Sequence, residues 1–514
     1  MFPALLGVWR NPIHTRNKSI SPYARAFRLK LCEPSCKNRQ IFSREEFSFN
    51  AVIYVVSFHA NSALLLHNCF VLWVTICVLS VQKYIFFQRY KVEKHFSVSF
   101  AVCMSKEKKK HGFWFYLGRV MAGIGIALLL LVLYVYLSVP TYSFKEPKPF
   151  SGEYLYNPYQ DMQPDQWKKY HFHCHSRKYF GLTNGRKSTE AAIDSVYQAL
   201  GYDHYGISDY MGINTHGSER EDYIPAYEHG YGLIRKTHQI CIGAESVYWP
   251  DFPFMQNLNM KQHMINKLGE RCRFVMPAHA SFTKGYKVSD MMLLSNYRLL
   301  EVLNPYGNAF EHWDKALSNG HRVYALGDDD THDITKASEV CHNLTMINTP
   351  DLDPEHVYEA LDKGLCYAVE FDNWYHFPMT LEEKAKQARS LPHLTRAELK
   401  GDTLYIETSV NKMQEVKFIG QDGKVLKNEE NIATASYVIQ PEDHYVRTQI
   451  DVNGLQHFYL NPVTRHPTPE PVDQRLDVVN KAQSYMYWFV YLIAIAAFAW
   501  YLFKKAKEKK EESK

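Results

Sequence analysis

Histidines alternate with other residues in one short segment, YHFHCHS, which runs from Tyr170 to Ser176. If this segment forms a β-strand, its period of two places His171, His173 and His175 on one face. Imidazole is the commonest protein ligand for zinc-like metals. An H-x-H pair alone is a weak signal, because the end of a polar strand also carries solvated histidines. The residues downstream decide between the two interpretations.

Polar residues recur downstream wherever a short apolar strand is expected to end. Strands are predicted at 204–207, 239–242, 274–276, 299–303 and 323–326, with helices between them, which is typical of an α/β fold. The motifs that follow these strands contain, in order, Asp209, Glu245, His279, the pair Glu301 and Asn304, and the pair Asp330 and His332. Sites in α/β barrels gather at the C-terminal ends of the strands, so we expect these side chains to converge.

The ordered motifs H-x-H, S-D-Y, G-x-E, P-x-H, E-x-x-N and D-x-H resemble those of the polymerase and histidinol phosphatase (PHP) family. The resemblance covers about residues 170–370 and is best in HFHCHS, STEAAIDSVYQALGYDHYGISDY and GDDDTHD. It implies a distorted (β/α)7-type barrel of parallel strands, with two or three metal ions at the C-terminal strand ends, that hydrolyses phosphoesters.

Two positions depart from the family pattern. Tyr210 stands where the family usually carries a histidine, and Asn184 stands where an aspartate or histidine is usual. Both positions serve the third metal in trinuclear members, so the departures imply a site with fewer ions. His216 is a candidate substitute, and a solvated loop histidine is the competing interpretation.

Phosphoester hydrolysis requires a hydroxide at neutral pH and positive charge near the phosphoryl oxygens, and two metal ions about 3.5–4 Å apart supply both. We therefore expect two divalent ions. A mixed set of imidazoles and carboxylates favours Zn, Mn or Fe over Mg or Ca. The predicted ligands are His173, His175 and Asp330 for one ion, Glu245 as the bridge, His279 for the neighbouring ion, and His332 beside Asp330. Asp209, as a carboxylate that orients a ligand imidazole, and Asn304 are the predicted catalytic residues.

Two uncharged segments are long enough to span a bilayer as helices. They lie within the predicted segments 104–139, which starts with a basic flank, and 485–503, which precedes the basic tail 504–514. By the positive-inside rule both basic flanks are cytoplasmic. The expected localisation is therefore a multi-pass protein of the inner membrane, with the PHP-like domain in the periplasm and the lipid bilayer as a partner.

The remaining segments differ in composition. Residues 1–103 form an N-terminal extension with one more uncharged stretch at 63–82, which is a third candidate span; the alternative is that translation starts at Met104. Residues 140–170 are rich in proline and predict a linker. The PHP-like domain is expected over 171–377, a small β-sandwich-like domain over 394–465, and a proline-rich stalk over 466–483.

Charge and cysteine content exclude some functions. The net charge is +5 and the basic residues gather at the membrane flanks, which argues against nucleic acid as the main partner. The ten cysteines include no CxxC pair, which argues against a zinc ribbon. The leading hypothesis is a membrane-anchored, metal-dependent phosphoesterase acting on a phosphorylated small molecule or a lipid-linked substrate. The alternatives are a non-catalytic receptor or scaffold with the same fold and a metal-dependent amidohydrolase.

Overall fold

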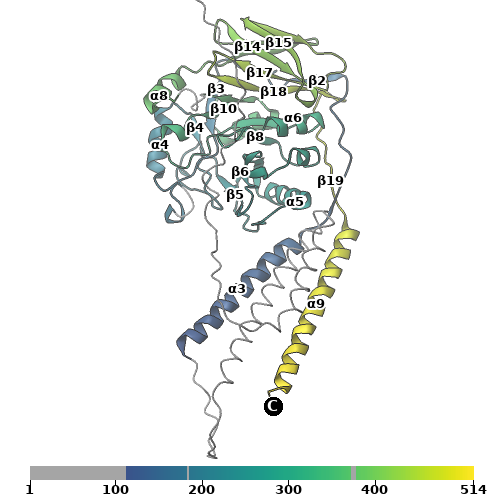
Figure 1. Ribbon diagram of the computed structural model, residues 1–514. Coiled ribbons are helices and arrows are strands. Elements are labelled where there is room, and N and C mark those ends of the chain that lie inside the picture. Colours follow the sequence, from purple (N-terminus) through teal and green to yellow (C-terminus); the bar gives the residue numbers. More distant parts are fainter. Residues whose placement is uncertain (1–111, 182–184, 372–377, 514) are drawn as a thin grey trace, which may run out of the picture. The chain divides into compact units, whose positions relative to one another are not determined.

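The protein is a mixed α/β molecule in its computed structural model, which describes residues 112–181, 185–371 and 378–513 (Figure 1). The predicted span 63–82 and Asn184 lie outside the described residues. The helices of the described part are α3 (Phe113–Leu137), α4 (Glu190–Ala199), α5 (Leu258–Gly269), α6 (Phe310–Ser318), α7 (Pro354–Lys363), α8 (Leu381–Arg389) and α9 (Lys481–Glu511).

The strands are numerous and mostly short. Those of the predicted PHP-like region and the segment before it are β1 (Tyr142–Phe144), β2 (Tyr154–Tyr156), β3 (Trp167–His171), β4 (His204–Tyr205), β5 (Ala226–His229), β6 (Gln239–Ala244), β7 (Cys272–Pro277), β8 (Leu299–Leu303), β9 (Tyr324–Gly327), β10 (Asn343–Asn348) and β11 (Cys366–Glu370). Those that follow are β12 (Leu394–Lys400), β13 (Thr403–Thr408), β14 (Met413–Ile419), β15 (Val425–Ile432), β16 (Ala435–Val438), β17 (Tyr445–Asp451), β18 (His457–His466) and β19 (Asp477–Val479).

Local sequence explains where the surface helices begin and end. In α7, the side chain of Asp353 accepts a hydrogen bond from the backbone N–H of Glu355, and Pro354 occupies the first turn. Proline has no N–H to leave unpaired there and its fixed φ suits a helix start. Gly364 ends the helix at φ +76, a left-handed conformation that glycine adopts without steric cost.

One sheet joins the predicted PHP-like region to the β-rich region. Its strand order is β15-β14-β17-β18-β11-β10-β3-β4, with β2 also paired to β18. The joint is the antiparallel pair of β11 and β18, in which Tyr367 lies opposite Leu460. The segment 394–465 consists mainly of strands, and a second sheet, β12-β13-β16, packs beside the first through the stacked rings of Phe418 and Tyr437. The β-rich region is therefore continuous with the α/β part.

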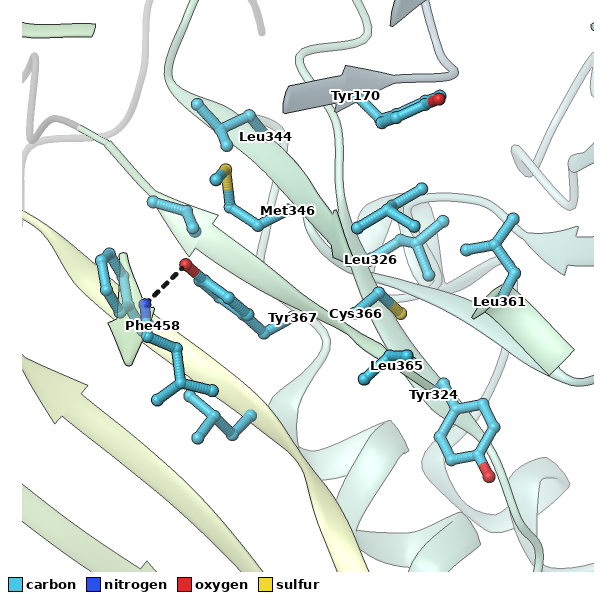
Figure 2. Close-up of a cluster of buried hydrophobic side chains, with 14 of the residues drawn as sticks. Tyr170, Tyr324, Leu326, Leu344, Met346, Leu361, Leu365, Cys366, Tyr367 and Phe458 are labelled. Atoms are coloured by element: carbon cyan, nitrogen blue, oxygen red, sulfur yellow. Dashed lines mark hydrogen bonds between the residues drawn. The ribbon is translucent and has the colours of Figure 1, made fainter. Parts of the chain in front are cut away.

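The main core lies where β9, β10, β11 and β18 meet. Figure 2 shows side chains from these strands and from α7 in contact, among them Leu326, Met346, Leu361 and Phe458. The hydroxyl of the fully buried Tyr367 accepts a hydrogen bond from the backbone N–H of Leu394, which ties β12 to this core.

The predicted barrel of parallel strands is not confirmed. In the part of the chain that the structure describes, the strands form separate sheets and none of them closes on itself. Strands β5, β6 and β7 pair antiparallel with β6 in the centre, and only β8–β9 and β3–β4 are parallel pairs. The direction of β6 decides which of its ends faces the candidate site, as described below.

Within the described residues, two helices are long and apolar enough to cross a membrane, by length and composition. They are α3, with a mean hydropathy of 2.6, and α9, with 1.8, and both lack burial within the molecule over their apolar windows. The two segments that lead from them into the folded part are not simple linkers. Residues 140–170 contain β1 and β2 and bury Phe150 and Tyr159, and the predicted stalk 466–483 contains β19, which pairs with β1.

Asn461 on β18 ties three strands together. Its side-chain oxygen accepts from the N–H of Ala325, and its amide donates to the carbonyl oxygens of Gly364 and Cys366. Asn461→Ala leaves these buried backbone groups unpaired, at a cost of roughly 1–3 kcal/mol for each group. We expect the apparent Tm of the full chain in detergent to fall by several degrees. The matched change Asn428→Ala, at an exposed residue, should leave the Tm nearly unchanged; equal Tm values for the two variants would contradict this role.

Candidate metal centre

The H-x-H segment follows β3 instead of belonging to it, because the strand ends at His171. His171 turns away from the other two histidines: its Nε2 accepts a hydrogen bond of 2.8 Å from the backbone N–H of Asp329. The segment that carries His173 and His175 is held by a bridge between Cys174 and Thr331 and by the hydrogen bond from His175 N to Thr331 O, 3.0 Å long. These bonds place His173 and His175 beside Asp330.

Donor atoms from the two chain segments and from β5 lie close together: His173, His175 and Asp330 form one candidate metal group, and Glu228 lies beside it. Asp330 Oδ1 lies 3.1 Å from the Nε2 atoms of both His173 and His175, and Glu228 Oε2 lies 3.5 and 3.2 Å from the same two atoms. A tetrahedral ion with ligand bonds near 2.1 Å requires donors roughly 3.4 Å apart. His173 Nε2 and Glu228 Oε2 are buried and have no hydrogen-bond partner among the described residues. The donor set therefore fits a metal ion.

The second oxygen of Glu228 faces two more histidines. Glu228 Oε1 lies 3.2 Å from His279 Nε2 and is also in close contact with His238 Nδ1. His173, Glu228 and His279 have donor atoms close enough to form a second candidate metal group. Glu228 is fully buried between the two groups, so its carboxylate is placed to bridge two ions.

Glu245, the predicted bridge, is not part of this cluster. It is exposed and follows the C-terminal end of β6, where its backbone N–H bonds to Arg271 O. The prediction assumed that β6 runs parallel to its neighbours. Because β6 runs antiparallel to β5 and β7, its N-terminal end, preceded by His238, lies at the site, and Glu245 lies at the opposite edge.

The sequence missed Glu228 and His238 for related reasons. Glu228 lies within AYEH, a four-residue strand with too few apolar residues to be recognised. His238 precedes strand β6, whereas the ligands predicted downstream of the H-x-H segment all follow strands. A sign of both was available in the eleven-residue segment EHGYGLIRKTH, which begins and ends with metal-competent side chains.

The three aspartates of the run Asp328-Asp329-Asp330 have different roles: the first two bind backbone groups, and the third faces the imidazoles of the cluster. Asp328 accepts a backbone N–H from Phe172, and Asp329 accepts three, from Cys341, His342 and Asn343. Asp330 makes no such bond among the described residues, and its carboxylate contacts imidazoles alone. Its φ of +49 is uncommon for a residue other than glycine, and His279 has a φ of +32. These backbone conformations turn both side chains toward the cluster.

Glu301 supports the cluster from behind. Its Oε1 is 2.8 Å from His173 Nδ1, and its Oε2 accepts the backbone N–H of His279 and the side-chain amide of Asn304. A carboxylate on the far ring nitrogen orients a ligand imidazole and fixes its tautomer. Asn304 therefore acts through Glu301, whose side chain lies between Asn304 and the donor atoms. The contact between Glu301 Oε1 and His173 Nδ1, and not a bond from Asp209, orients a ligand histidine.

Asp209 holds the chain next to His175. Its carboxylate accepts the backbone N–H and the hydroxyl of Ser176, each at 2.8 Å, and the amide of Asn214. Asp209 is buried but does not contact an imidazole of the cluster in any described bond. The prediction that it orients a ligand imidazole directly is corrected to a role in the backbone of the H-x-H loop.

His332 lies at the edge of the cluster. Its Nδ1 is 2.7 Å from Asp330 O, its Nε2 is 3.4 Å from the hydroxyl of Tyr210, and its ring packs against His175. The ring of Tyr210 stacks on that of His175, with ring centroids 4.4 Å apart. His332 is in neither candidate metal group. His216 is also in neither group; its Nε2 lies 2.8 Å from Asp194 Oδ2, and its side chain is partly exposed.

The pKa directions show that the cluster attracts cations. Burial would lower the pKa of His173, but Asp330, Glu301 and Glu228 together raise it well above its usual value. Burial likewise opposes protonation of His175, and bonds to Asp330 and Glu228 nevertheless raise its pKa to about 9. Burial would raise the pKa of Glu228, and the surrounding histidines hold it well below its usual range. The carboxylates that favour protonation of these histidines also favour the binding of a divalent cation at the same place.

Comparisons with known proteins add one finding. No family model matches the chain, and no curated protein matches it. A solved two-domain structure from Bacteroides vulgatus ATCC 8482, described as containing a predicted PHP-like metal-dependent phosphoesterase, is similar at 12% identity with a TM-score of 0.32. The similarity covers 65% of this chain and 99% of the other. At that TM-score it establishes neither the fold nor the activity of this chain.

A direct comparison of the two glutamates tests the corrected ligand set. Glu228→Gln removes the charge between the two donor groups, so we expect the metal content of the purified full chain, measured by elemental analysis, to fall by at least half. Glu245→Gln is the matched control and should retain the content of the unsubstituted chain. The reverse order of the two variants would restore Glu245 as the bridge.

The role of Glu301 predicts a weaker effect of a different kind. Glu301→Gln keeps the size of the side chain but weakens its bond to His173 Nδ1. We expect metal affinity, measured by competition with a chromogenic chelator, to fall by about 10–100-fold while the metal content at saturation is unchanged. Loss of metal even at saturation would show that Glu301 is itself a ligand.

Proposed function

We propose that the protein is a membrane-anchored phosphoesterase that depends on two divalent transition metal ions. The observation that carries this proposal is the buried carboxylate of Glu228, which presents one oxygen to His173 and His175 and the other to His238 and His279. A bridging carboxylate between two imidazole-rich donor groups is the arrangement that a two-metal hydrolase requires. The donor types favour Zn, Mn or Fe.

The residues that would hold the ions are His173, His175 and Asp330 for one, with Glu228 beside them, and His173, Glu228 and His279 for the other, with His238 next to Glu228. Two divalent ions bound at these donors supply a hydroxide nucleophile at neutral pH and positive charge for the phosphoryl oxygens. The chain itself supplies the orientation, since Glu301 fixes His173 and the backbone of His279, and Asp209 fixes the loop after His175.

Aromatic residues lie between the donor atoms and the surface of the molecule. The hydroxyl of Tyr306 is 3.3 Å from His332 Nδ1, and its ring packs against that of Phe282, which in turn contacts His279. Tyr306 is 45% exposed, whereas the donor atoms behind it are buried. A phosphoester that reaches the donors passes these rings and His332, which limit access of bulk water to the centre.

Membrane anchoring is supported by α3 and α9, whose apolar windows are not buried in the molecule. Basic residues precede the first helix in the sequence and follow the second, and by the positive-inside rule this distribution supports the proposal that the metal centre lies on the non-cytoplasmic side of an inner membrane.

Turnover tests this function against the two alternatives. The full chain, purified in detergent and loaded with Zn, Mn or Fe, should hydrolyse a generic phosphomonoester or phosphodiester. His175→Ala should lower this turnover by more than about 100-fold, because even residues that only support a ligand cost 10–100-fold. His216→Ala, a histidine outside the cluster, should leave it unchanged.

The other outcomes are distinct. Bound metal without turnover of either ester would favour the receptor or scaffold, in which Tyr210 stacked on His175 replaces a ligand. Turnover of amides in place of phosphoesters would favour the amidohydrolase.

A further inference from the structure

Two loops near the metal centre expose an unusual amount of apolar surface. Residues 230–237 join β5 to β6, and residues 247–256 lie between β6 and α5. Their exposed side chains and exposed fractions are Leu233 69%, Ile234 60%, Trp249 57%, Phe254 45% and Tyr231 43%. Single exposed apolar residues are ordinary, but five within two short loops mark a contact surface.

The two loops form one unit through hydrogen bonds. The backbone N–H of Leu233 donates to Pro253 O at 2.9 Å, and the hydroxyl of Tyr231 donates to Trp249 O at 3.2 Å. The N–H of Tyr231 also donates to the side chain of Asp251. The exposed apolar side chains are therefore presented together.

This unit is attached to the end of the first candidate membrane helix. Tyr136, in the last turn of α3, accepts a hydrogen bond of 3.0 Å from the N–H of Phe254, and its ring contacts those of Phe252 and Phe254. Phe252 is buried, so the contact fixes the C-terminal end of α3 to the loops. Because α3 is an unburied apolar helix of 25 residues, the loops lie where such a helix leaves a bilayer.

Basic residues border the apolar surface. Arg235 and Lys236 follow Ile234 directly, and both contact the next loop, through Lys284 O and the hydroxyl of Thr283. Lys284 and Lys287 of that loop are exposed. An apolar tip with tryptophan and tyrosine, bordered by lysine and arginine, fits a lipid surface that carries anionic headgroups.

The same loop is part of the metal centre. Residues 230–237 begin two residues after Glu228 and end at the residue before His238, and both of these side chains belong to the cluster. The neighbouring loop that receives Arg235 and Lys236 also carries Phe282, one of the aromatic rings described above. The apolar surface and this ring thus belong to adjoining loops.

We propose that the loops 230–237 and 247–256 lie in the membrane–water interface beside α3, and that the metal centre hydrolyses the phosphoester of a membrane lipid headgroup. This inference rests on the proposed phosphoesterase activity. In the reaction, the oxygen of water bonds to phosphorus and the phosphorus–oxygen ester bond breaks. The released alcohol keeps the ester oxygen and takes up a proton, so no oxidant or reductant is required.

The test compares two substrates with one loop variant. The full chain is reconstituted in nanodiscs of phosphatidylcholine that contain phosphatidic acid or phosphatidylglycerol, which supply a monoester and a diester in the bilayer. Para-nitrophenyl phosphate and its bis ester are the soluble substrates. We expect the double variant Leu233→Asp and Ile234→Asp to lower turnover of the lipid about tenfold or more relative to turnover of the soluble ester, because two charges must enter the interface.

The control is Val438→Asp, at a residue that is 53% exposed on β16 in the β-rich region. It should leave the ratio of the two turnovers unchanged. An equal loss with both substrates in the loop variant, or no loss with either, would overturn the interfacial position. A changed oligomeric state of the loop variant in detergent would overturn it as well, since the surface would then join two copies of the chain.

The substrate class and the activity can fail separately. A chain that hydrolyses the soluble esters but neither phospholipid overturns the lipid substrate and leaves the phosphoesterase in place. A metal-loaded chain that hydrolyses no ester in either form overturns both.

Discussion

The structure of the candidate site depends on how buried carboxylates are neutralised. Besides Asp209, five acidic side chains lie within it at 4% exposure or less: Glu228, Glu301, Asp328, Asp329 and Asp330. A buried charge is costly unless it is paired or bonded, and three of the five receive neutral donors: backbone N–H groups reach Asp328 and Asp329, and Asn304 with the N–H of His279 reaches Glu301. In the contacts described above, the carboxylates of Glu228 and Asp330 face imidazoles. These two carboxylates therefore require cations, and their histidine neighbours are suited to share a metal ion with them.

The sequence revealed part of this site because some ligands lie close together in the chain. His173 and His175 are two residues apart, and Asp330 lies in a short acidic run after a buried strand, so their spacing together with the order of the downstream motifs predicted them as ligands. The assignment of Asp330 within its run needed the structure, because backbone bonds to Asp328 and Asp329 are made by residues distant in sequence. Glu245 was misassigned because a short apolar run has the same pattern whichever way the strand runs in its sheet. The orientation of β6 is set by its pairing with β5 and β7, which no local pattern contains.

A similar limit applies to the fold. Strands were correctly expected in both halves of the described chain, since alternation and turn residues are local signals. The pairing of β18 with β11 joins residues about ninety positions apart, as Leu460 and Tyr367 show. That pairing makes one sheet of two regions that the sequence suggests are separate. The parallel barrel implied by the family resemblance is likewise a statement about pairing, and it is not confirmed.

The position of the centre relative to the loop 230–237 links its chemistry to its surroundings. Glu228 and His238 lie at the two ends of this loop and also contact each other. The loop is thus a closed segment whose base is part of the metal centre and whose tip is the exposed pair Leu233 and Ile234. Constraining the tip reduces the number of conformations open to the loop, and so lowers the entropy cost of holding Glu228 and His238 in position for metal. A surface that binds the tip therefore favours an ordered centre, and the end of α3 is hydrogen-bonded to the second loop of the same unit.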